Sequence, residues 1–408
     1  DEWFGLDNDI DFFTPQKLAN RSFQASMNGD KVKLRRSFES QMTEESLRFP
    51  IIPPPSPPNR VPQEVCSSQS LRLWWLQDRT FHRPIADVRL SIVCKEANKT
   101  PFHKACAELA VALCVDEMIE TSYLAEVCDL HVSISSTDDG FVLRVHGFND
   151  NLKSLLELSL SKLFRVQLST GQDGAFVSEN RFKFCLAAVR RKYRNCNMKA
   201  ATLSSSLRVE AMRTNLWNAS SKLHALEDID LASFLATAKE ILCTVSFECL
   251  LHGNVDKDDA KHVMKSLLDN LKVYAKASMP RKQYPKHSVL RAPHANDLPV
   301  ILVPSKDAKD PNTSVEVYFQ ISKDNTRDRV IIDLLVDMME EPFYDQIRTK
   351  DQFGYDVSCD VRWSWGIMGF LFSIVSNNKS AKEATERIDD FLRSFHEQLQ
   401  RMGANEFI

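Results

Sequence analysis

The sequence has no surplus of positive charge. Its 52 Lys and Arg residues are balanced by 55 Asp and Glu residues, which gives a net charge of −3. Proteins that bind nucleic acids or membrane surfaces are usually basic, so this balance argues against both classes. The sequence also has no apolar run near the roughly 20 residues that a membrane-spanning helix needs. We therefore expect neither a nucleic acid nor a membrane as a partner.

Glycine is scarce, and the cysteines are scattered. The 11 glycines do not cluster into a phosphate-binding loop, and none of the ten cysteines stands in a Cys-x-x-Cys pair. We expect most of these cysteines to be small buried hydrophobic residues with free thiols, which suits a reducing compartment. No basic-then-apolar leader follows Asp1. These features predict a cytoplasmic location.

Proline, in contrast, is concentrated in one place. Seven prolines lie between Phe49 and Pro62, including five of the six residues from Pro53 to Pro58. Consecutive prolines fix φ and remove backbone donors, so this segment is expected to be an extended polyproline-II strap. We interpret it as a semi-rigid linker between globular parts. A ligand for a proline-recognition domain is the alternative.

From residue 71 onward, one order of elements occurs twice: strand, strand, helix, β-hairpin, helix. The first copy is predicted as strands at 71–77 and 85–94, a helix at 101–125, hairpin strands around 130–134 and 141–145, and a helix from 149. The second is predicted as strands at 300–303 and 315–321, a helix at 326–350 kinked at Pro342, hairpin strands at 355–361 and 368–374, and a helix from a capping box at Ser380–Glu383. The periodicity of the helix at 326–350 places Ile331, Leu334, Leu335 and Met338 on one apolar face. Matching elements start 225 to 231 residues apart, which indicates two copies of one unit.

This order predicts an α+β fold with two homologous domains, each a largely antiparallel sheet with helices packed on one face. The first copy continues with helices at 178–195, 200–216 and 229–241, a strand at 245–252 and a helix at 257–277. We therefore assign residues 71–285 and 286–408 to the two domains and residues 1–70 to a linker region. An equally long second copy would run past residue 408, so we expect that copy to be truncated.

Six segments, in this order, resemble the insulin-degrading enzyme (insulysin), nardilysin and pitrilysin family of zinc metallopeptidases, the inverzincins. They are Asp1–Gly5, Leu71–Trp74 with Phe81 and Ala86–Ser91, Arg144–Asp150, Leu250–Asn254, Glu341–Tyr355 and Gly366–Phe370. Glu341–Tyr355 is the most specific of them. The family's zinc motif, His-x-x-Glu-His, occurs nowhere among the ten histidines. The resemblance implies an enzyme of four homologous α/β domains, in which an extended linker joins a zinc-bearing N-terminal half to a C-terminal half, and the halves close around a chamber.

The resemblance further implies that Arg348 and Tyr355 point across that chamber toward substrate at the zinc site, with Gly354 beside them as a substrate-binding residue. A guanidinium and a phenol are donors that can stabilise charge on the scissile carbonyl oxygen or hold the substrate backbone. Read from the residues alone, Arg348 could equally cap the preceding helix, and Tyr355 could pack as an aromatic strand residue. Asp351 and Phe353 stand where the family often has Glu and Leu.

We expect no metal site in this chain. His103, Cys106 and Glu108 begin the helix of the first copy, where a zinc-bearing copy would carry its motif. The spacing of His103 and Glu108, however, places their side chains on different faces of that helix. His131 and His146 could be cross-strand neighbours, but they lack a third ligand. The resemblance implies instead that zinc is bound by the N-terminal half.

By this resemblance, the chain is the end of the N-terminal half (1–70), a non-catalytic third domain and an incomplete fourth domain of an insulysin-like zinc metalloendopeptidase. It would enclose and orient peptide substrates for hydrolysis at zinc in an N-terminal half, which the same gene or a partner chain supplies. Alone, the chain should be inactive. The alternative is a catalytically inactive peptidase-fold scaffold or peptide-binding subunit of a larger assembly. A homo-oligomer is possible in either case.

Overall fold

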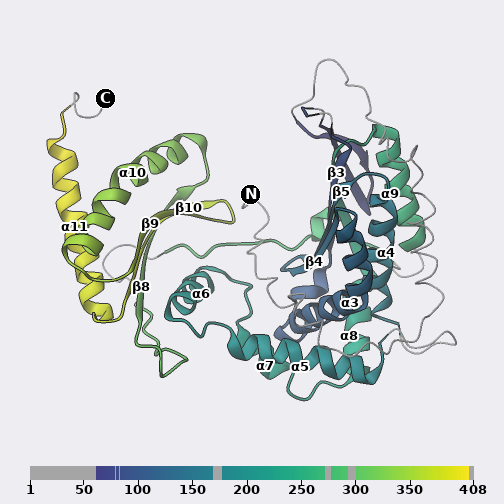
Figure 1. Cartoon of the computed structure of the whole chain (residues 1–408), viewed down its shortest axis with the longest axis horizontal. Helices are drawn as coiled ribbons and strands as arrows, with labels where there is room; N and C mark the ends of the chain where they lie inside the picture. Colours follow the sequence, from purple (N-terminus) through teal and green to yellow (C-terminus); the bar gives the residue numbers. More distant parts are fainter. Residues whose placement is uncertain are drawn as a thin grey trace. The chain divides into compact units, whose positions relative to one another are not determined.

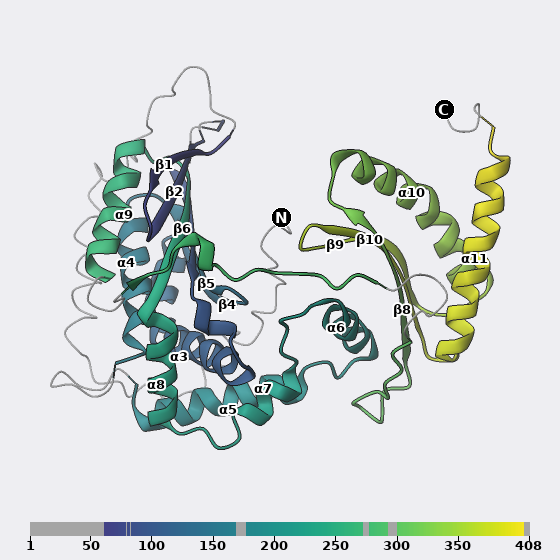
Figure 2. The same ribbon diagram turned by 180° about the vertical axis from the view of Figure 1, so that it is seen from behind.

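The computed structural model describes residues 61–78, 80–81, 83–168, 177–271, 277–292 and 300–403. The segment Asp1–Gly5 and nearly all of the expected proline strap lie outside these residues. Two sheets follow one another along the chain, each with helices against it (Figure 1, and from behind in Figure 2). Within the described part of the chain, no helix has the length and apolar character to cross a membrane.

The first sheet has seven strands. The strand order is β1 (Gln63–Ser67), β2 (Leu71–Gln77), β6 (Thr244–Gly253), β3 (Ile85–Val93), β5 (Gly140–Phe148) and β4 (Leu130–Thr137), with β7 (Ala277–Ser278) beside β6. Only the β2–β6 and β6–β7 pairs are parallel, so the prediction of a largely antiparallel sheet is confirmed. The sheet begins at Gln63, within the segment that the sequence analysis assigned to the linker.

The helices of the first copy form close to where the sequence predicts them. They are α3 (Pro101–Val127), α4 (Leu152–Arg165), α5 (Glu179–Asn195), α6 (Ala200–Met212), α7 (Ala219–Ala225), α8 (Leu231–Cys243) and α9 (Lys257–Leu271). Helix α3 begins after Thr100, whose side chain accepts a hydrogen bond from the main-chain N–H of His103, and Pro101 occupies its first turn. The short elements β1, β7 and α7 were not predicted.

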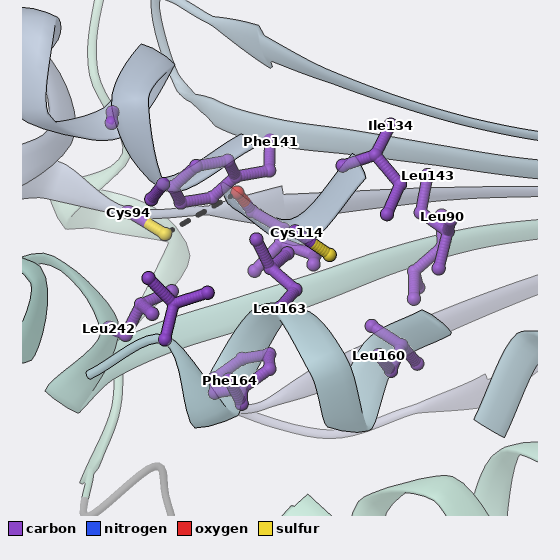
Figure 3. Packing of buried hydrophobic residues seen from close by; sticks show 14 of the residues in the cluster. Leu90, Cys94, Cys114, Ile134, Phe141, Leu143, Leu160, Leu163, Phe164 and Leu242 are labelled. Atoms are coloured by element: carbon purple, nitrogen blue, oxygen red, sulfur yellow. Dashed lines mark hydrogen bonds between the residues drawn. The ribbon is translucent and has the colours of Figure 1, made fainter. Parts of the chain in front are cut away.

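The core of the first copy lies between the sheet and helices α3, α4, α5, α8 and α9, and none of the described residues of α6 belongs to it. Alternate residues of β3, Val88, Leu90 and Ile92, are fully buried. Figure 3 shows the thiols of Cys94 and Cys114 among the surrounding leucines and phenylalanines; Cys94 Sγ lies 3.6 Å from the Ile92 carbonyl oxygen. All ten cysteines are free thiols and six are buried, so the prediction that most serve as small hydrophobic residues is confirmed.

The second sheet has three antiparallel strands in the order β8 (Thr313–Lys323), β10 (Ile367–Ser376) and β9 (Asp356–Ser364). Helices α10 (Thr326–Tyr344) and α11 (Ala381–Arg401) pack against it, and a π-helix, η4 (Asp345–Lys350), continues α10. The capping box predicted at Ser380 and Glu383 is present. Fully buried phenylalanines from α10 and β10, Phe343 and Phe372, meet edge to face with ring centroids 5.2 Å apart.

Two predictions for the second copy are wrong. Residues 300–303 form no strand, and their four apolar side chains are exposed. The matching strand of the first copy, β2, is held by parallel pairing with β6, and no described strand pairs with 300–303 in this way. The predicted buried face of α10 is also shifted, since Ile331 and Leu334 are exposed and Ile332 is buried. Apolar residues stand at adjacent positions along this helix, so periodicity alone selected the wrong face.

Candidate functional site

The residues singled out by the sequence lie in one corner, Asp345–Tyr355, where α10 gives way to β9. The α-helix contains Pro342 in its last turn, and the chain then widens into the π-helix η4. Such π-helical turns are rare and occur often at functional sites. Gln352 follows with a φ of 55°, in the left-handed region, and turns the chain toward the sheet. The predicted helix–turn–strand junction is therefore present.

Arg348 connects the two sides of this corner. Its Nη1 donates hydrogen bonds to the main-chain carbonyl oxygens of Gly354, at 3.3 Å, and of Tyr355. Both acceptors lie at the entry to β9, and neither is a carbonyl of the preceding helix. The guanidinium carbon also lies 5.6 Å from the ring centroid of Tyr344, within the range of a cation–π interaction. Arg348 thus fixes the position of the Tyr355 main chain and uses only part of its donor capacity.

Tyr355 projects its side chain outward. The residue is 57% exposed, and its main-chain N–H donates to the carbonyl oxygen of Val375 on β10 at 3.2 Å. Its phenol has no hydrogen-bond partner among the residues that the structure describes. The backbone is therefore held by the sheet while the hydroxyl group is free to donate to a ligand.

Gly354 is required by close packing of two backbones. A Cβ atom at this position would lie 2.1 Å from the carbonyl oxygen of Val375, which is far inside contact distance. Glycine alone allows the chain to pass β10 this closely. Its contribution to the corner is therefore through the main chain, including the carbonyl group that accepts from Arg348.

Asp351 and Phe353 anchor the corner. Asp351 Oδ2 accepts from Arg387 Nε of α11 at 2.5 Å, and Asp351 Oδ1 accepts from Gln346 at 3.0 Å. Phe353 packs against the core of the second sheet, and its N–H donates to the Ile347 carbonyl oxygen at 3.0 Å. Both residues that depart from the family pattern therefore contribute to the local structure.

Sequence reasoning missed Tyr344, which is 44% exposed beside Arg348. Its spacing of four residues before Arg348 was the available signal, because residues so spaced on a helix are neighbours. Together, Tyr344, Arg348 and Tyr355 offer two phenols and a guanidinium. Such a group of donors can hold a carbonyl or carboxylate oxygen of a ligand. It contains no cysteine, histidine or serine to act as a nucleophile or general base.

The three residues of α3 that the sequence analysis considered as metal ligands have different surroundings. Glu108 pairs with Lys222 Nζ at 2.7 Å and accepts from the Tyr193 hydroxyl group at 2.9 Å. Cys106 is fully buried, and burial raises the pKa of its thiol to about 12. His103 instead lies beside two carboxylates from other elements, Glu96 and Glu240, with one potential ligand atom of each within 4.8 Å of the others. The hydrophobic periodicity of the sequence could not reveal that His103 lies beside Glu240, because Glu240 lies far along the chain on α8.

His131 and His146 are cross-strand partners in β4 and β5, with ring centroids 4.7 Å apart. The predicted neighbourhood is therefore confirmed. The described residues with metal-ligand geometry do not include this pair.

Two family models match the chain. Residues 46–225 match the middle or third domain of peptidase M16, and residues 334–408 match domain 4 of the C-terminal lobe of PqqF-like PQQ synthase proteins. A nardilysin-like protein of Arabidopsis thaliana is 28% identical over 85% of the chain and 33% of its own length. Human insulin-degrading enzyme is 25% identical over the whole chain and 38% of its own length. A crystal structure of pitrilysin superposes with a TM-score of 0.68 at 18% identity, covering 88% of this chain and 37% of pitrilysin.

These matches show that the chain is similar to proteins of the M16 peptidase family. It corresponds to the C-terminal half, the third and fourth domains, of proteins like insulin-degrading enzyme, nardilysin and pitrilysin. The chain spans only about a third of the length of these curated relatives.

Proposed function

We propose that this chain is the non-catalytic half of an insulysin-like metalloendopeptidase, which encloses and orients peptide substrates. A zinc ion bound by an N-terminal half, from the same gene or a partner chain, would activate the attacking water. The chain's own contribution would be substrate positioning. One observation carries the proposal: an outward phenol at Tyr355, on a backbone that Arg348 and the sheet hold in place.

Arg348 and Tyr355 would have different roles in substrate positioning. Arg348 holds the entry to β9 through the carbonyl oxygens of Gly354 and Tyr355, and so sets where the phenol lies. Tyr355 would donate its hydroxyl hydrogen to a carbonyl oxygen of the peptide, or to the oxyanion that develops there during hydrolysis. A donor that is already in place costs no reorganisation when the charge appears. Gly354 would contribute by allowing the backbone to lie close to β10.

The free cysteines of the chain support a location in a reducing compartment. All ten cysteines are free thiols, as is usual for proteins of the cytoplasm. We therefore infer a cytoplasmic location, with peptides as substrates and the N-terminal half as the main partner.

Photo-crosslinking tests the substrate contact directly. A benzophenone amino acid would replace Tyr355 in the full-length protein, and a labelled peptide of about 25 residues would be added after chelation prevents cleavage. We expect the label to attach at position 355. A matched protein with the same amino acid at Tyr123, which is also exposed at 64% on α3, should attach little label.

The crosslinking result also separates the proposal from its alternative, an inactive scaffold or peptide-binding subunit. If anisotropy shows that the peptide binds but position 355 captures none of it, Tyr355 has no part in substrate binding. That result would favour the scaffold, because the exposed phenol of Tyr355 would then have no role in binding the peptide.

A further inference from the structure

A cluster of metal-ligating side chains lies where the start of α3 meets the end of α8. Glu96 comes from the 3-10 helix η2 (Lys95–Asn98), His103 from the first turn of α3, and Glu240 from the last turn of α8. One imidazole nitrogen and two carboxylate oxygens lie within 4.8 Å of one another. We call this set the Glu96–His103–Glu240 cluster. It belongs to the first copy and shares no residue with the Arg348–Tyr355 corner of the second.

The imidazole of His103 is oriented toward the carboxylates. Its Nδ1 lies 2.8 Å from the hydroxyl oxygen of Thr100, and this hydrogen bond fixes the ring. Its Nε2 lies 3.4 Å from Glu240 Oε2 and is buried without a hydrogen-bond partner. Histidines that bind metals usually have their second ring nitrogen held in this way, which sets the ring orientation. The Nε2 atom is therefore placed as a metal ligand would be.

Glu96 also presents a buried oxygen to the cluster. Its Oε2 has no partner in hydrogen-bond geometry, although Lys99 Nζ lies 2.8 Å away as an ion pair. The same ammonium group donates to Glu240 Oε1 at 2.9 Å. Two carboxylates thus share the single positive charge of Lys99. That lysine side chain is 51% exposed, so it can turn into water without uncovering the core.

We propose that Glu96, His103 and Glu240 bind a divalent transition-metal ion of the zinc class, with Lys99 as the built-in cation that the metal displaces. One imidazole and two carboxylates are a common donor set for zinc, which accepts three protein ligands and a water molecule. Calcium and magnesium prefer sites made of oxygen atoms alone. A divalent ion brings twice the charge of the lysine ammonium to the same two carboxylates.

The geometry needs only a small adjustment. Tetrahedral ligands about 2.1 Å from zinc lie about 3.4 Å from one another, and His103 Nε2 and Glu240 Oε2 are already separated by 3.4 Å. Glu96 completes the site by a side-chain rotation on the short helix η2. The bound metal would join η2 and α3 to α8. Because the unfolded chain does not bring these residues together, binding would stabilise the fold.

The experiment is a metal titration of the 408-residue chain after chelator washing. Zinc affinity would be measured by calorimetry, and the ligand type by the visible spectrum of the cobalt(II) complex. We expect one metal ion per chain, a metal-dependent rise in melting temperature, and a cobalt spectrum without thiolate charge-transfer bands. His103→Ala and Glu240→Gln should each weaken binding at least tenfold. Lys99→Met should strengthen it, because the competing cation is gone.

A matched control is available on α7, where exposed His224 lies 3.1 Å from Glu227. His224→Ala should leave the affinity unchanged, and circular dichroism confirms that each variant is folded. The proposal is overturned if wild type and Lys99→Met bind no metal. It is also overturned if His103→Ala and Glu240→Gln bind as tightly as wild type, or if thiolate bands assign the metal to cysteines.

Discussion

Arg348 Nη1 donates a hydrogen bond to the main-chain carbonyl oxygen of Tyr355, so the guanidinium group holds the backbone of the residue whose phenol faces solvent. The two residues that the sequence marked as parallel substrate contacts are therefore unequal. Under the proposed function, Arg348 would act mainly through Tyr355, which presents the exposed phenol. This relationship makes distinct predictions for the two positions.

Replacing Arg348 should affect both stability and activity. Arg348→Ala removes the hydrogen bonds to the Gly354 and Tyr355 carbonyl oxygens, which should lower the free energy of unfolding by about 1 kcal/mol. Arg348→Lys should recover part of the loss, because an ammonium group can reach one carbonyl oxygen but lacks the planar fork of donors. Urea unfolding and peptide cleavage by the full-length protein would be measured together. Equal behaviour of both variants and wild type would show that the hydrogen bonds do not hold the corner.

Gly354→Ala should destabilise the second sheet. The new Cβ would meet the Val375 carbonyl oxygen at 2.1 Å, and relieving such overlap typically costs about 1–3 kcal/mol. Gly403→Ala is the matched control, since a Cβ there meets no atom within 4 Å. Thermal melts of both variants give the comparison. If Gly354→Ala melts like the control, β9 and β10 are not as close at this point as the structure has them.

Glu108→Gln should destabilise the first copy in a pH-dependent manner. Burial would raise the pKa of Glu108, but Lys222 and Lys104 outweigh burial and hold this pKa below its ordinary value. A carboxylate of this kind stabilises the fold above its unfolded-state pKa, and the contribution is lost as pH falls through the folded-state pKa. At pH 7, removing one partner of this largely buried pair should cost about 3 kcal/mol.

The difference between wild type and Glu108→Gln should therefore shrink as pH falls below about 4. Urea unfolding at pH 7 and at acid pH measures it, with exposed Glu227→Gln as the control. A destabilisation that is constant with pH would mean that the charge of Glu108 is not responsible.

Thiol labelling should proceed in stages. Cys128 is the exposed cysteine among the ten and should react first with a disulfide reagent. Burial raises the pKa of Cys106 and Cys114 to about 12, so these thiols should react only after unfolding. Cys128→Ser should remove the fast phase and leave the rest unchanged. Rapid labelling of Cys106 or Cys114 in the native chain would contradict the burial described for the core of the first copy.

The sequence predicts most of the fold because its signals are local. The turn at Thr137–Gly140, the capping box at Ser380 and the alternation in β10 each specify an element through neighbouring residues. The failed strand at 300–303 is different, because a strand needs a partner and the partner of β2 comes from the far end of its copy. Likewise, α10 has apolar residues on more than one face, and only packing selects Ile332 over Ile331.

The candidate site was predictable in its position but not in its contacts. The run Arg348–Tyr355 marks a helix–strand junction, and the glycine signals a tight passage of the backbone. The hydrogen bond from Arg348 to the Tyr355 carbonyl oxygen and the ion pair of Asp351 with Arg387 depend on how the corner folds back. The Glu96–His103–Glu240 cluster was beyond local reasoning, since tertiary packing alone brings α8 to the start of α3.

The most direct test of the account is the steady-state cleavage of a quenched fluorescent peptide by Tyr355→Phe in the full-length protein. The change removes one hydroxyl group and leaves the backbone that Arg348 holds. Losing a donor to a developing oxyanion typically lowers the rate by about 10²–10³-fold. We predict such a fall in kcat/KM, with zinc content and melting temperature unchanged and with Tyr123→Phe as active as wild type. A Tyr355→Phe enzyme with wild-type kcat/KM would contradict the claim that this half of the molecule supplies a substrate contact through Tyr355.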